Sequence, residues 1–315
     1  YTTNPTNPLE GQMWYNNTTG TLKVYIMGAA AWSSANASPV AKRSGGSAGT
    51  QTANVIFSGS TPTGSINVTG EYDGTNWTTS GVYGNSSYAL SGFGIQTAAI
   101  GIGGMTPPGS VPTPFEYDGS TWTATPGTGT GAACTGAAGT TAAGLKFGGS
   151  VTPPFANVTN ASEEWNGSSW TASPGNLNTS RAYLGGFGTQ TAALGAGGYK
   201  PAQATEAETY DGSTWTATTA LPTARMMAGC SGTQTAAFYF GGSSPGHTGT
   251  GIVFDGTNWA ASPASLATAR NNMGGSPSGT STTALATCGT TPSAPVNNTE
   301  EFNGAAVEVQ TVTTS

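Results

Sequence analysis

Apolar and polar residues alternate in short runs along most of this chain, a pattern that predicts β-strands. Typical runs are "RAYLGGFG" from Arg181 and "QTAALGAGG" from Gln190, each bounded by turn-forming residues. Tryptophan recurs along the chain at intervals of 45, 45, 48, 45 and 44 residues, and Val307 stands 48 residues further on. The positions of this series are Trp32, Trp77, Trp122, Trp170, Trp215 and Trp259.

A block of small residues follows each tryptophan at a distance of seventeen to twenty residues. One copy is "GTQTAALGAGG" from Gly188, and in all six copies the closing glycine lies ten residues after the opening one. This constant length indicates a strand that every repeat shares. The opening and closing glycines are Gly49 and Gly59, Gly94 and Gly104, Gly139 and Gly149, Gly188 and Gly198, Gly232 and Gly242, and Gly279 and Gly289.

A third repeated segment, "EYDGSTWTA" from Glu116 in one copy, joins an aromatic residue to the next tryptophan. We expect a tight hairpin in which the Asp-Gly pair supplies the positive φ angles and the aromatic residues fill the space between neighbouring sheets. Two copies have Asn instead of Asp, which favours a structural role over a catalytic carboxylate. The pairs are Asp73-Gly74, Asp118-Gly119, Asn166-Gly167, Asp211-Gly212, Asp255-Gly256 and Asn303-Gly304.

A period of 44–48 residues built only from strands is typical of β-propeller blades. We predict an all-β fold: a six-bladed propeller of four-stranded blades over residues 35–315, preceded by an N-terminal hairpin module over residues 1–34. The glycine-rich strands are expected near the axis, where neighbouring strands approach closely. Two closures are open, because either the strand at Trp32 or the final segment "AAVEVQTV" can complete the sixth blade.

The composition excludes several classes of protein. Only 7% of the residues are charged, yet 8 Trp, 11 Tyr and 10 Phe argue against disorder. A net charge of −6 without a basic patch predicts no nucleic-acid partner, and the lack of an 18-residue apolar run predicts no membrane insertion. No secretory signal peptide is recognisable, and a start at Tyr1 is compatible with an upstream part. We expect Cys134, Cys230 and Cys288 to be small buried apolar residues rather than disulfide partners or metal ligands.

Candidate catalytic groups are few. The single histidine, His247, cannot form the copper site of a kelch-fold oxidase, and "DGSTW" departs from the Asp-box of sialidase-type propellers by one residue. The carboxylate pairs Glu163/Glu164, Glu206/Glu208 and Glu300/Glu301 each precede the repeated aromatic, so a structural role is the simpler interpretation. Arginines before the inner strand could ring one end of the axis or cover apolar surface with their stems. They are Arg43, Arg181, Arg225 and Arg270. We therefore expect no catalytic residue, metal or cofactor.

The order Gly-Gly, Tyr, Trp within each unit resembles the kelch repeat. The units also resemble kelch-like repeats of virion and tail-fibre proteins of marine tailed bacteriophages, cyanophages included, over about residues 32–315. Residues 4–32, "NPTNPLEGQMWYNNTTGTLKVYIMGAAAW", are similar to a small hairpin module of phage tail and fibre proteins. The resemblance implies a virion protein on the particle surface, joined to other virion proteins through the N-terminal module. Trimers are common among phage fibres, although no heptads here indicate one.

Function is expected on the face that carries the variable loops, opposite the repeated turns. These loops cover residues 58–70, 105–115, 150–162, 199–207, 243–252 and 290–299. Attachment to a host-surface glycan is the favoured hypothesis, with a structural spacer and a glycan-degrading enzyme as alternatives. The residues expected to contact the glycan are Tyr83, Tyr88, Phe115, Phe155, Tyr199, Arg181 and Arg225.

Overall fold

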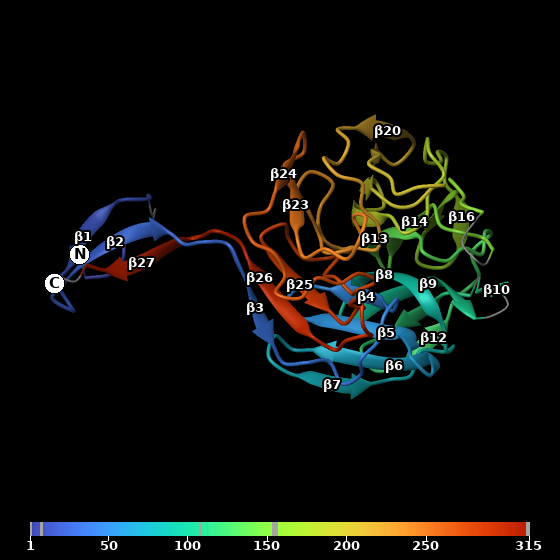
Figure 1. Cartoon of the computed structure of the whole chain (residues 1–315), viewed down its shortest axis with the longest axis horizontal. Helices are drawn as coiled ribbons and strands as arrows, with labels where there is room; N and C mark the ends of the chain where they lie inside the picture. Colours follow the sequence, from blue (N-terminus) through green and yellow to red (C-terminus); the bar gives the residue numbers. More distant parts are fainter. Residues whose placement is uncertain (1, 7–8, 107–108, 112, 153–156, 313–315) are drawn as a thin grey trace.

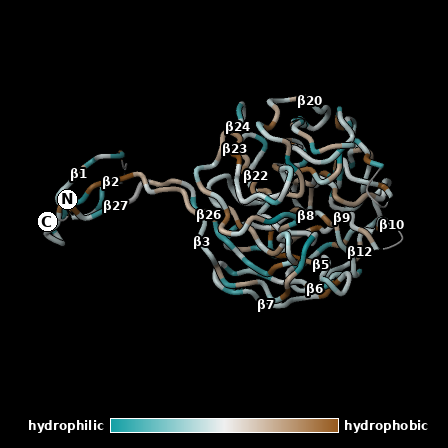
Figure 2. The backbone as a smooth tube through the Cα atoms, viewed as in Figure 1, coloured by the Kyte–Doolittle hydropathy of each residue, from teal (hydrophilic) through white to brown (hydrophobic). Residues whose placement is uncertain are grey.

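The structure is a computed structural model that describes residues 2–6, 9–106, 109–111, 113–152 and 157–312. The described residues form seven antiparallel sheets and no helix, so they contain no helix that could span a membrane. Six sheets make up a globular β-propeller, and the seventh projects from it with both chain termini at its far end (Figure 1). Hydrophobic residues are scattered in short runs along the backbone and do not gather in one long segment (Figure 2).

The projecting sheet, which we call the terminal sheet, joins the two ends of the chain. Its strand order is β1-β2-β27, so the last strand of the protein pairs with the N-terminal hairpin. Its bounds are β1 (Met13–Asn16), β2 (Thr21–Met27) and β27 (Val307–Thr311).

The first three sheets of the propeller are each built from consecutive strands of the chain. Sheet 1 contains β4 (Gly46–Gly49), β5 (Asn54–Thr61), β6 (Gly64–Tyr72) and β7 (Trp77–Ser80). Sheet 2 contains β8 (Tyr88–Ile95), β9 (Ala98–Thr106), β10 (Gly109–Ser110), β11 (Phe115–Tyr117) and β12 (Trp122–Ala124). Sheet 3 contains β13 (Gly136–Thr140), β14 (Ala143–Phe147), β15 (Ser162–Trp165) and β16 (Trp170–Ala172).

Sheets 4 and 5 each consist of four consecutive strands, whereas sheet 6 has three strands. Sheet 4 contains β17 (Gly185–Thr189), β18 (Ala192–Ala196), β19 (Ala207–Tyr210) and β20 (Trp215–Thr218). Sheet 5 contains β21 (Gly229–Gly232), β22 (Ala237–Phe240), β23 (Gly251–Phe254) and β24 (Trp259–Ala261). Sheet 6 has the order β25-β26-β3, with β25 (Thr283–Thr287), β26 (Thr299–Asn303) and β3 (Ala31–Ala35).

Sheet 6 is where the chain closes on itself. Phe302 of β26 pairs with Trp32 of β3, so the strand at Trp32 is the outer strand of the last sheet. Of the two closures that the sequence left open, the structure therefore has the one that ties the N-terminal part to the C-terminal repeat. The domain division at residues 34/35 stays a prediction, and strand pairing crosses it at both ends, through β3 and through β27.

The repeated tryptophans form a belt of aromatic pairs in the outer part of the propeller. In every sheet the tryptophan lies 4.8–5.5 Å, ring to ring, from the aromatic residue that precedes the turn, as Tyr117 and Trp122 do at 4.8 Å. Trp122 also lies 4.6 Å from Phe57 of sheet 1, and Trp215 lies 4.7 Å from Phe147 of sheet 3. The tryptophans thus fill the space between neighbouring sheets.

The turn between the paired aromatics differs in detail from the expected two-residue hairpin. Tyr72 pairs directly with Trp77, which leaves four residues in the turn. Gly74 has a φ of 91°, but Asp73 does not adopt a positive φ. Asp73 instead accepts the amides of Thr75 and Asn76 at 2.8 and 2.7 Å, an Asx turn that Asn166 reproduces. This explains why Asp and Asn interchange here.

A glutamine in the small-residue block ties each of four sheets to the preceding one. Gln190 donates to the carbonyl oxygens of Trp165 and Gly144 at 2.7 and 3.0 Å. Gln51, Gln96 and Gln234 make the corresponding bonds. The repeated "GTQTA" is therefore a connection between sheets as well as a tight turn.

Candidate functional site

A closed ring of backbone hydrogen bonds surrounds the axis of the propeller at one end. Each ring residue donates its amide to the carbonyl of the ring residue one repeat earlier, over 2.7–3.2 Å, and Ser44 closes the circle by donating to Asn272 at 2.9 Å. All six ring residues have a φ between 52° and 63°. They are Ser44, Ala89, Cys134, Tyr183, Met227 and Asn272.

None of the ring residues is a glycine, although glycine is the cheapest residue for a positive φ. A non-glycine residue in this conformation costs about 1–3 kcal/mol unless its surroundings compensate. The ring needs the left-handed backbone so that amide and carbonyl point around the circle, but it does not need six different side chains. At the ring positions, the six repeats therefore carry different side chains on equivalent backbones.

Two connected hollows lie at this end. An axial cavity of about 130 Å³ is lined by residues of all six repeats. A wider hollow of about 430 Å³, which we call the mouth pocket, shares Ser44, Ala89, Tyr183, Met227 and Asn272 with it. Its volume lies in the range of roughly 300–1,000 Å³ that is common for small-molecule sites.

The mouth pocket contains polar groups from one row of sheet 1. Arg43, Ser60 and Ser65 are cross-strand neighbours, since Ser60 pairs with both, and all three line the pocket. Arg43 is exposed. Tyr88 lines the pocket from sheet 2 and donates its hydroxyl to Sδ of Met105 at 3.2 Å. A guanidinium, hydroxyls and an aromatic ring thus face one space.

The opposite end of the axis has a different lining. A hollow of about 360 Å³ is bordered mainly by the Gly-Thr steps of the small-residue blocks, among them Gly188-Thr189 and Gly232-Thr233. Here the equivalent positions of several repeats carry the same residues, as the repeat itself requires.

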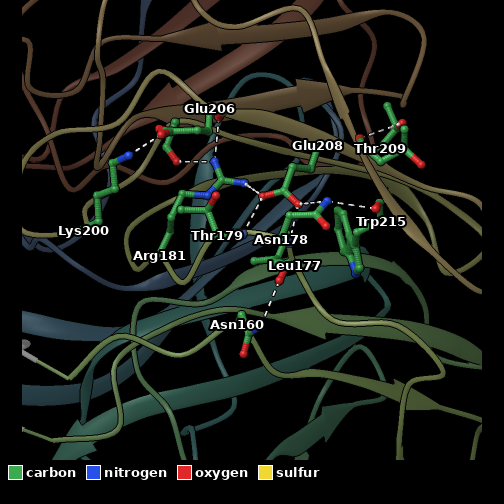
Figure 3. A network of polar contacts seen from close by, with 12 residues as sticks. Asn160, Leu177, Asn178, Thr179, Arg181, Lys200, Glu206, Glu208, Thr209 and Trp215 are labelled. Carbon is green, nitrogen blue, oxygen red and sulfur yellow. Dashed lines mark hydrogen bonds and ion pairs between the residues drawn. The ribbon is translucent and has the colours of Figure 1, made fainter.

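The arginines do not form the exposed ring that the sequence allowed. Arg181 is fully buried and pairs with Glu208 at 2.8 Å, and its other amino group donates to the carbonyls of Gly197 and Glu206 (Figure 3). Desolvation lowers the pKa of Arg181. Arg270 pairs with Glu300 in the same way, and Lys146 pairs with Glu163 at 2.8 Å. Arg181 is therefore a structural residue, and its prediction as a ligand contact is wrong.

Arg225 is buried too, and it donates to the carbonyls of Gly241 and Thr250 at 2.8 and 2.6 Å. It is also unavailable to a ligand. Lys42, not Arg43, takes the position of the buried arginines, two residues before the ring. Burial lowers the pKa of Lys42 to about 8. Arg43 stands one residue nearer the ring, which is why it alone of the four arginines lies in the mouth pocket.

Two of the predicted aromatic contacts are in the core. Tyr83 is 1% exposed and stacks on Phe57 at 5.2 Å, and Phe115 packs against Tyr83 at 4.9 Å. They are buried because the wedge between sheets 1 and 2 takes both rings, so their prediction as sugar-stacking residues is wrong. Tyr88 and Tyr199 are half-buried at the variable-loop end, and Phe155 lies outside the described residues.

The segments predicted as variable loops contain regular β-pairing. Residues 58–70, expected as a loop, continue β5 and β6 as a hairpin with an irregularity between Phe57 and Gly59. In other repeats, isolated bridges such as Ser150 to Val158 and Tyr199 to Gln203 brace the same segment. The described parts of these loops therefore form short β-arms, and the arm of sheet 1 lines the mouth pocket through Ser60, Gly64 and Ser65.

The carboxylates are engaged in structural hydrogen bonds. Glu163 accepts the amides of Gly129 and Thr130 at 2.7 and 2.9 Å as well as Lys146. Glu164 accepts the hydroxyl of Tyr210 at 2.6 Å. Glu71 accepts that of Tyr117 at 2.6 Å; burial, together with this bond, raises the pKa of Tyr117 to about 12. The bonds of Glu164 and Glu71 join neighbouring sheets, whereas Glu163 and Lys146 pair within sheet 3; both arrangements are in line with the structural interpretation of the repeated glutamates.

Other chemically reactive groups are isolated. The three cysteines are free; Cys134 and Cys288 are buried and Cys230 is half-buried. Within the described ranges, no group of three His, Cys, Asp or Glu residues could hold a metal ion. His247 is half-buried in a β-arm, where it pairs with Ser243.

Comparison with known proteins supports the fold. No family model matches the chain, and no curated protein matches it. Among solved structures, a structure of YjhT superposes with a TM-score of 0.71 at 12% identity, covering 87% of this chain and 99% of that one. At this identity the likeness concerns the β-propeller fold alone. Because 241 chains of solved structures match, the fold by itself points to no single activity.

The ring is the feature that sequence reasoning missed. Its only signal is positional: the ring residue stands five residues before the opening glycine in five repeats and seven before it in the sixth, with a different side chain each time. Without knowledge of the positive φ, those positions look like ordinary variation.

Proposed function

We propose that this protein is a non-catalytic attachment protein that binds a glycan in the mouth pocket, displayed on a virion by the terminal sheet. The observation that carries the proposal is the ring: six different side chains in a strained backbone conformation around the axis, five of which line the mouth pocket. Strained non-glycine residues persist only where the surrounding structure compensates for the backbone cost, and they cluster at functional sites.

The groups in the pocket suit a sugar. Tyr88 offers an aromatic face, Ser60 and Ser65 offer hydroxyls, and Arg43 offers a guanidinium that can donate to ring oxygens, hydroxyls or an acidic substituent. Carbohydrate sites need such a mixture because sugars present an apolar face and a polar rim. No Asp or Glu is among the described residues that line the mouth pocket, which favours binding over hydrolysis.

The terminal sheet suits an anchoring role. Most of the large hydrophobic residues that are strongly exposed lie in it or next to it: Leu9, Met13, Tyr15, Leu22, Met27, Val309 and Val312. On one face, Met13 stands opposite Val24 and Tyr15 opposite Leu22. On the other face, Trp14 is buried against Tyr25 at 4.4 Å. An exposed apolar sheet face far from the mouth pocket fits attachment to another virion protein.

Binding of the purified chain to polysaccharides of candidate host cells tests the proposal. We expect Arg43→Ala and Tyr88→Ala to weaken binding at least about tenfold, a loss of about 1.4 kcal/mol or more. Thr189→Ala, at the opposite end of the axis, is the matched control and should bind normally. Native binding that survives both mouth substitutions would contradict the proposal.

A structural spacer remains the second candidate. The specific observation in its favour is the set of side-chain hydrogen bonds that connect neighbouring sheets, such as those of Gln190 to sheet 3, which a ligand-free appendage would also need. A position in the particle where neighbours cover the mouth pocket would decide for the spacer.

A further inference from the structure

Four repeats carry a buried basic residue two positions before the ring residue. Each of these side chains donates to a backbone carbonyl of its own repeat, as Lys42 does to Val68 at 3.1 Å. The four residues are Lys42, Arg181, Arg225 and Arg270. Sheet 1 therefore has its structural cation in Lys42, and Arg43 is an additional basic residue.

The backbone around Arg43 recurs in other repeats without a charge. Arg43 forms a β-bridge with Ser60, and Ala182 forms the corresponding bridge with Tyr199. None of the other five repeats has a charged residue directly before its ring residue. Those five residues are Tyr88, Ala133, Ala182, Met226 and Asn271. The fold therefore does not require a guanidinium at this position.

The guanidinium of Arg43 has no protein partner in the described part of the chain. There, every other lysine and arginine side chain donates a hydrogen bond or forms an ion pair, and that of Arg43 does neither. The six variable-loop segments contain one acidic residue, Glu206, and it pairs with Lys200. Arg43 is therefore an unpaired cation in a pocket whose described lining has no carboxylate.

Four exposed aspartates lie far from the mouth-pocket end of the axis, which we call the open end. Ser65 stands near the start of β6 and Asp73 directly follows its end, so about 25 Å of strand separates them. The amides that donate to Asp73 lower the pKa of its carboxyl, which is therefore ionised at neutral pH. The equivalent turns contain Asp118, Asp211 and Asp255. Because salt screens charges over about 8 Å, these aspartates do not cancel the attraction of Arg43 for an anion.

The chemistry of the guanidinium narrows the class of ligand. Its planar fork of donors matches two oxygens of a carboxylate or a sulfate group. Hydrogen bonds between charged partners are stronger than those to the hydroxyls of a neutral sugar. Ser60 and Ser65, which pair with each other beside Arg43, offer hydroxyls to the rest of the sugar.

We infer that the mouth pocket recognises an acidic glycan, whose sugars carry a carboxylate or a sulfate ester that Arg43 binds. This inference rests on the proposed function and deepens it, since it names the class of glycan. Arg43 selects the acidic sugar by its charge. Tyr88 and the two serines contact parts that acidic and neutral sugars share.

Two matched pairs of polymers test the inference. Polygalacturonate is compared with its methyl ester, and dextran sulfate with dextran, so that each pair shares a sugar backbone and differs in charge. The dissociation constants of the native chain are measured at physiological salt. Its net charge of −6 disfavours non-specific binding of a polyanion.

We expect at least one acidic polymer to bind about 10–100-fold more tightly than its uncharged partner. A preference for polygalacturonate identifies a carboxylate as the group on Arg43, and a preference for dextran sulfate identifies a sulfate ester. Equal affinity within both pairs, or no saturable binding of either acidic polymer, would overturn the inference. If a host polysaccharide still bound through Arg43 and Tyr88 in that case, the proposed function would stand alone.

The ratio of the two affinities within a pair also separates the roles of the pocket residues. Arg43→Gln removes the charge and should bring the ratio to about one, whereas Arg43→Lys should keep part of it. Tyr88→Ala should weaken the binding of both polymers and keep most of the ratio. Lys23→Gln, which removes a cation from the terminal sheet, is the matched control and should bind as the native chain does.

Tryptophan fluorescence of each variant checks that the propeller is folded. An unchanged ratio in folded Arg43→Gln would contradict the inference. Loss of the ratio in Lys23→Gln would also contradict it, because the polyanion would then bind outside the mouth pocket.

Discussion

The two ends of the propeller axis are built by the same six repeats but are lined differently. At the end opposite the mouth pocket, the hollow is bordered by repeated Gly-Thr steps such as Gly188-Thr189. At the open end, six different side chains surround the mouth and all of them have positive φ angles. At the open end the backbone keeps its repeat, since the ring of hydrogen bonds is complete.

This difference shows where a repeat protein can carry a specific function. Positions that join sheets, such as Gln190 and Trp215, must satisfy the same neighbours in each repeat, so they recur. Ring positions at the open end join their equivalents through backbone amides and carbonyls, so each can hold a different side chain. Variation is informative here because the fold does not impose it.

Removing a buried ion pair should have the largest effect, and it should act on both ends together. Arg181→Met leaves the carboxylate of Glu208, whose side chain is 2% exposed, without its cation. We expect a loss of about 3–5 kcal/mol in the free energy of unfolding, measured with urea. Lys200→Met, which breaks an ion pair that is about one-third exposed, should cost at most about 1 kcal/mol. Equal losses of unfolding free energy in the two variants would show that the buried ion pairs stabilise the propeller no more than the exposed one.

Lys42 takes the position of the buried arginines, and Arg43 lines the mouth pocket. The effects of a buried residue and of a pocket residue can therefore be compared at adjacent positions. Lys42 has a pKa of about 8 in the folded state, below the 10.5 of an ordinary lysine. Between these values the unfolded chain binds more protons, so native stability rises with pH, by at most about 1.4 kcal/mol per pH unit. The stability advantage of Lys42→Met should therefore be largest below pH 8 and shrink by about 2 kcal/mol toward pH 10.

The control for that prediction is Arg43→Met, which should change binding without changing the pH dependence of unfolding. Urea titrations of both variants at pH 7 and pH 9.5 make the comparison. A constant difference between the native protein and Lys42→Met would show that Lys42 stays protonated in the folded state throughout.

Loss of one glutamine connection should have an intermediate effect. Gln190→Ala removes two hydrogen bonds to sheet 3 and leaves the carbonyls of Gly144 and Trp165 without them. We expect a destabilisation of about 1–2 kcal/mol in thermal or urea unfolding, with normal glycan binding. A large loss of binding without a loss of stability would contradict the claim that Gln190 stabilises the propeller and takes no part in glycan binding.

Relief of backbone strain in the ring should have the smallest effect and the opposite sign. Ser44→Gly removes the side chain at a φ of 56°. The gain from relieved strain exceeds the added freedom of the unfolded chain, so we expect a stabilisation of about 0.5–1 kcal/mol. Destabilisation in urea unfolding would show that the side chain, not only the backbone, supports the ring.

The repeat made much of the fold accessible from the sequence. The spacing of Trp32, Trp77 and their equivalents indicated a propeller because each repeat must bury the same aromatic pair. The closure could not be deduced, because both Trp32 and Val307 stand at the right step; pairing of Phe302 with Trp32 decides it.

Most of the candidate site escaped prediction for a physical reason. Tyr83 and Phe115 look like loop aromatics, and Arg181 looks like a surface cation, until burial between sheets is known. Arg43 and Lys42 are neighbours in sequence, and only the position of the ring tells which of them faces the pocket. The structure places Tyr88 in the lining of the mouth pocket, and its contact with a glycan stays a prediction.

One pair of substitutions tests the central claim, that the mouth pocket binds a host polysaccharide and the hollow at the opposite end of the axis does not. Ser65→Trp fills the mouth pocket, and Thr189→Trp places the same bulk in the opposite hollow. The measurement is the dissociation constant for a host polysaccharide that the native chain binds. The account predicts at least about tenfold weaker binding for Ser65→Trp and no change for Thr189→Trp. Weaker binding for Thr189→Trp with native affinity in Ser65→Trp would contradict it.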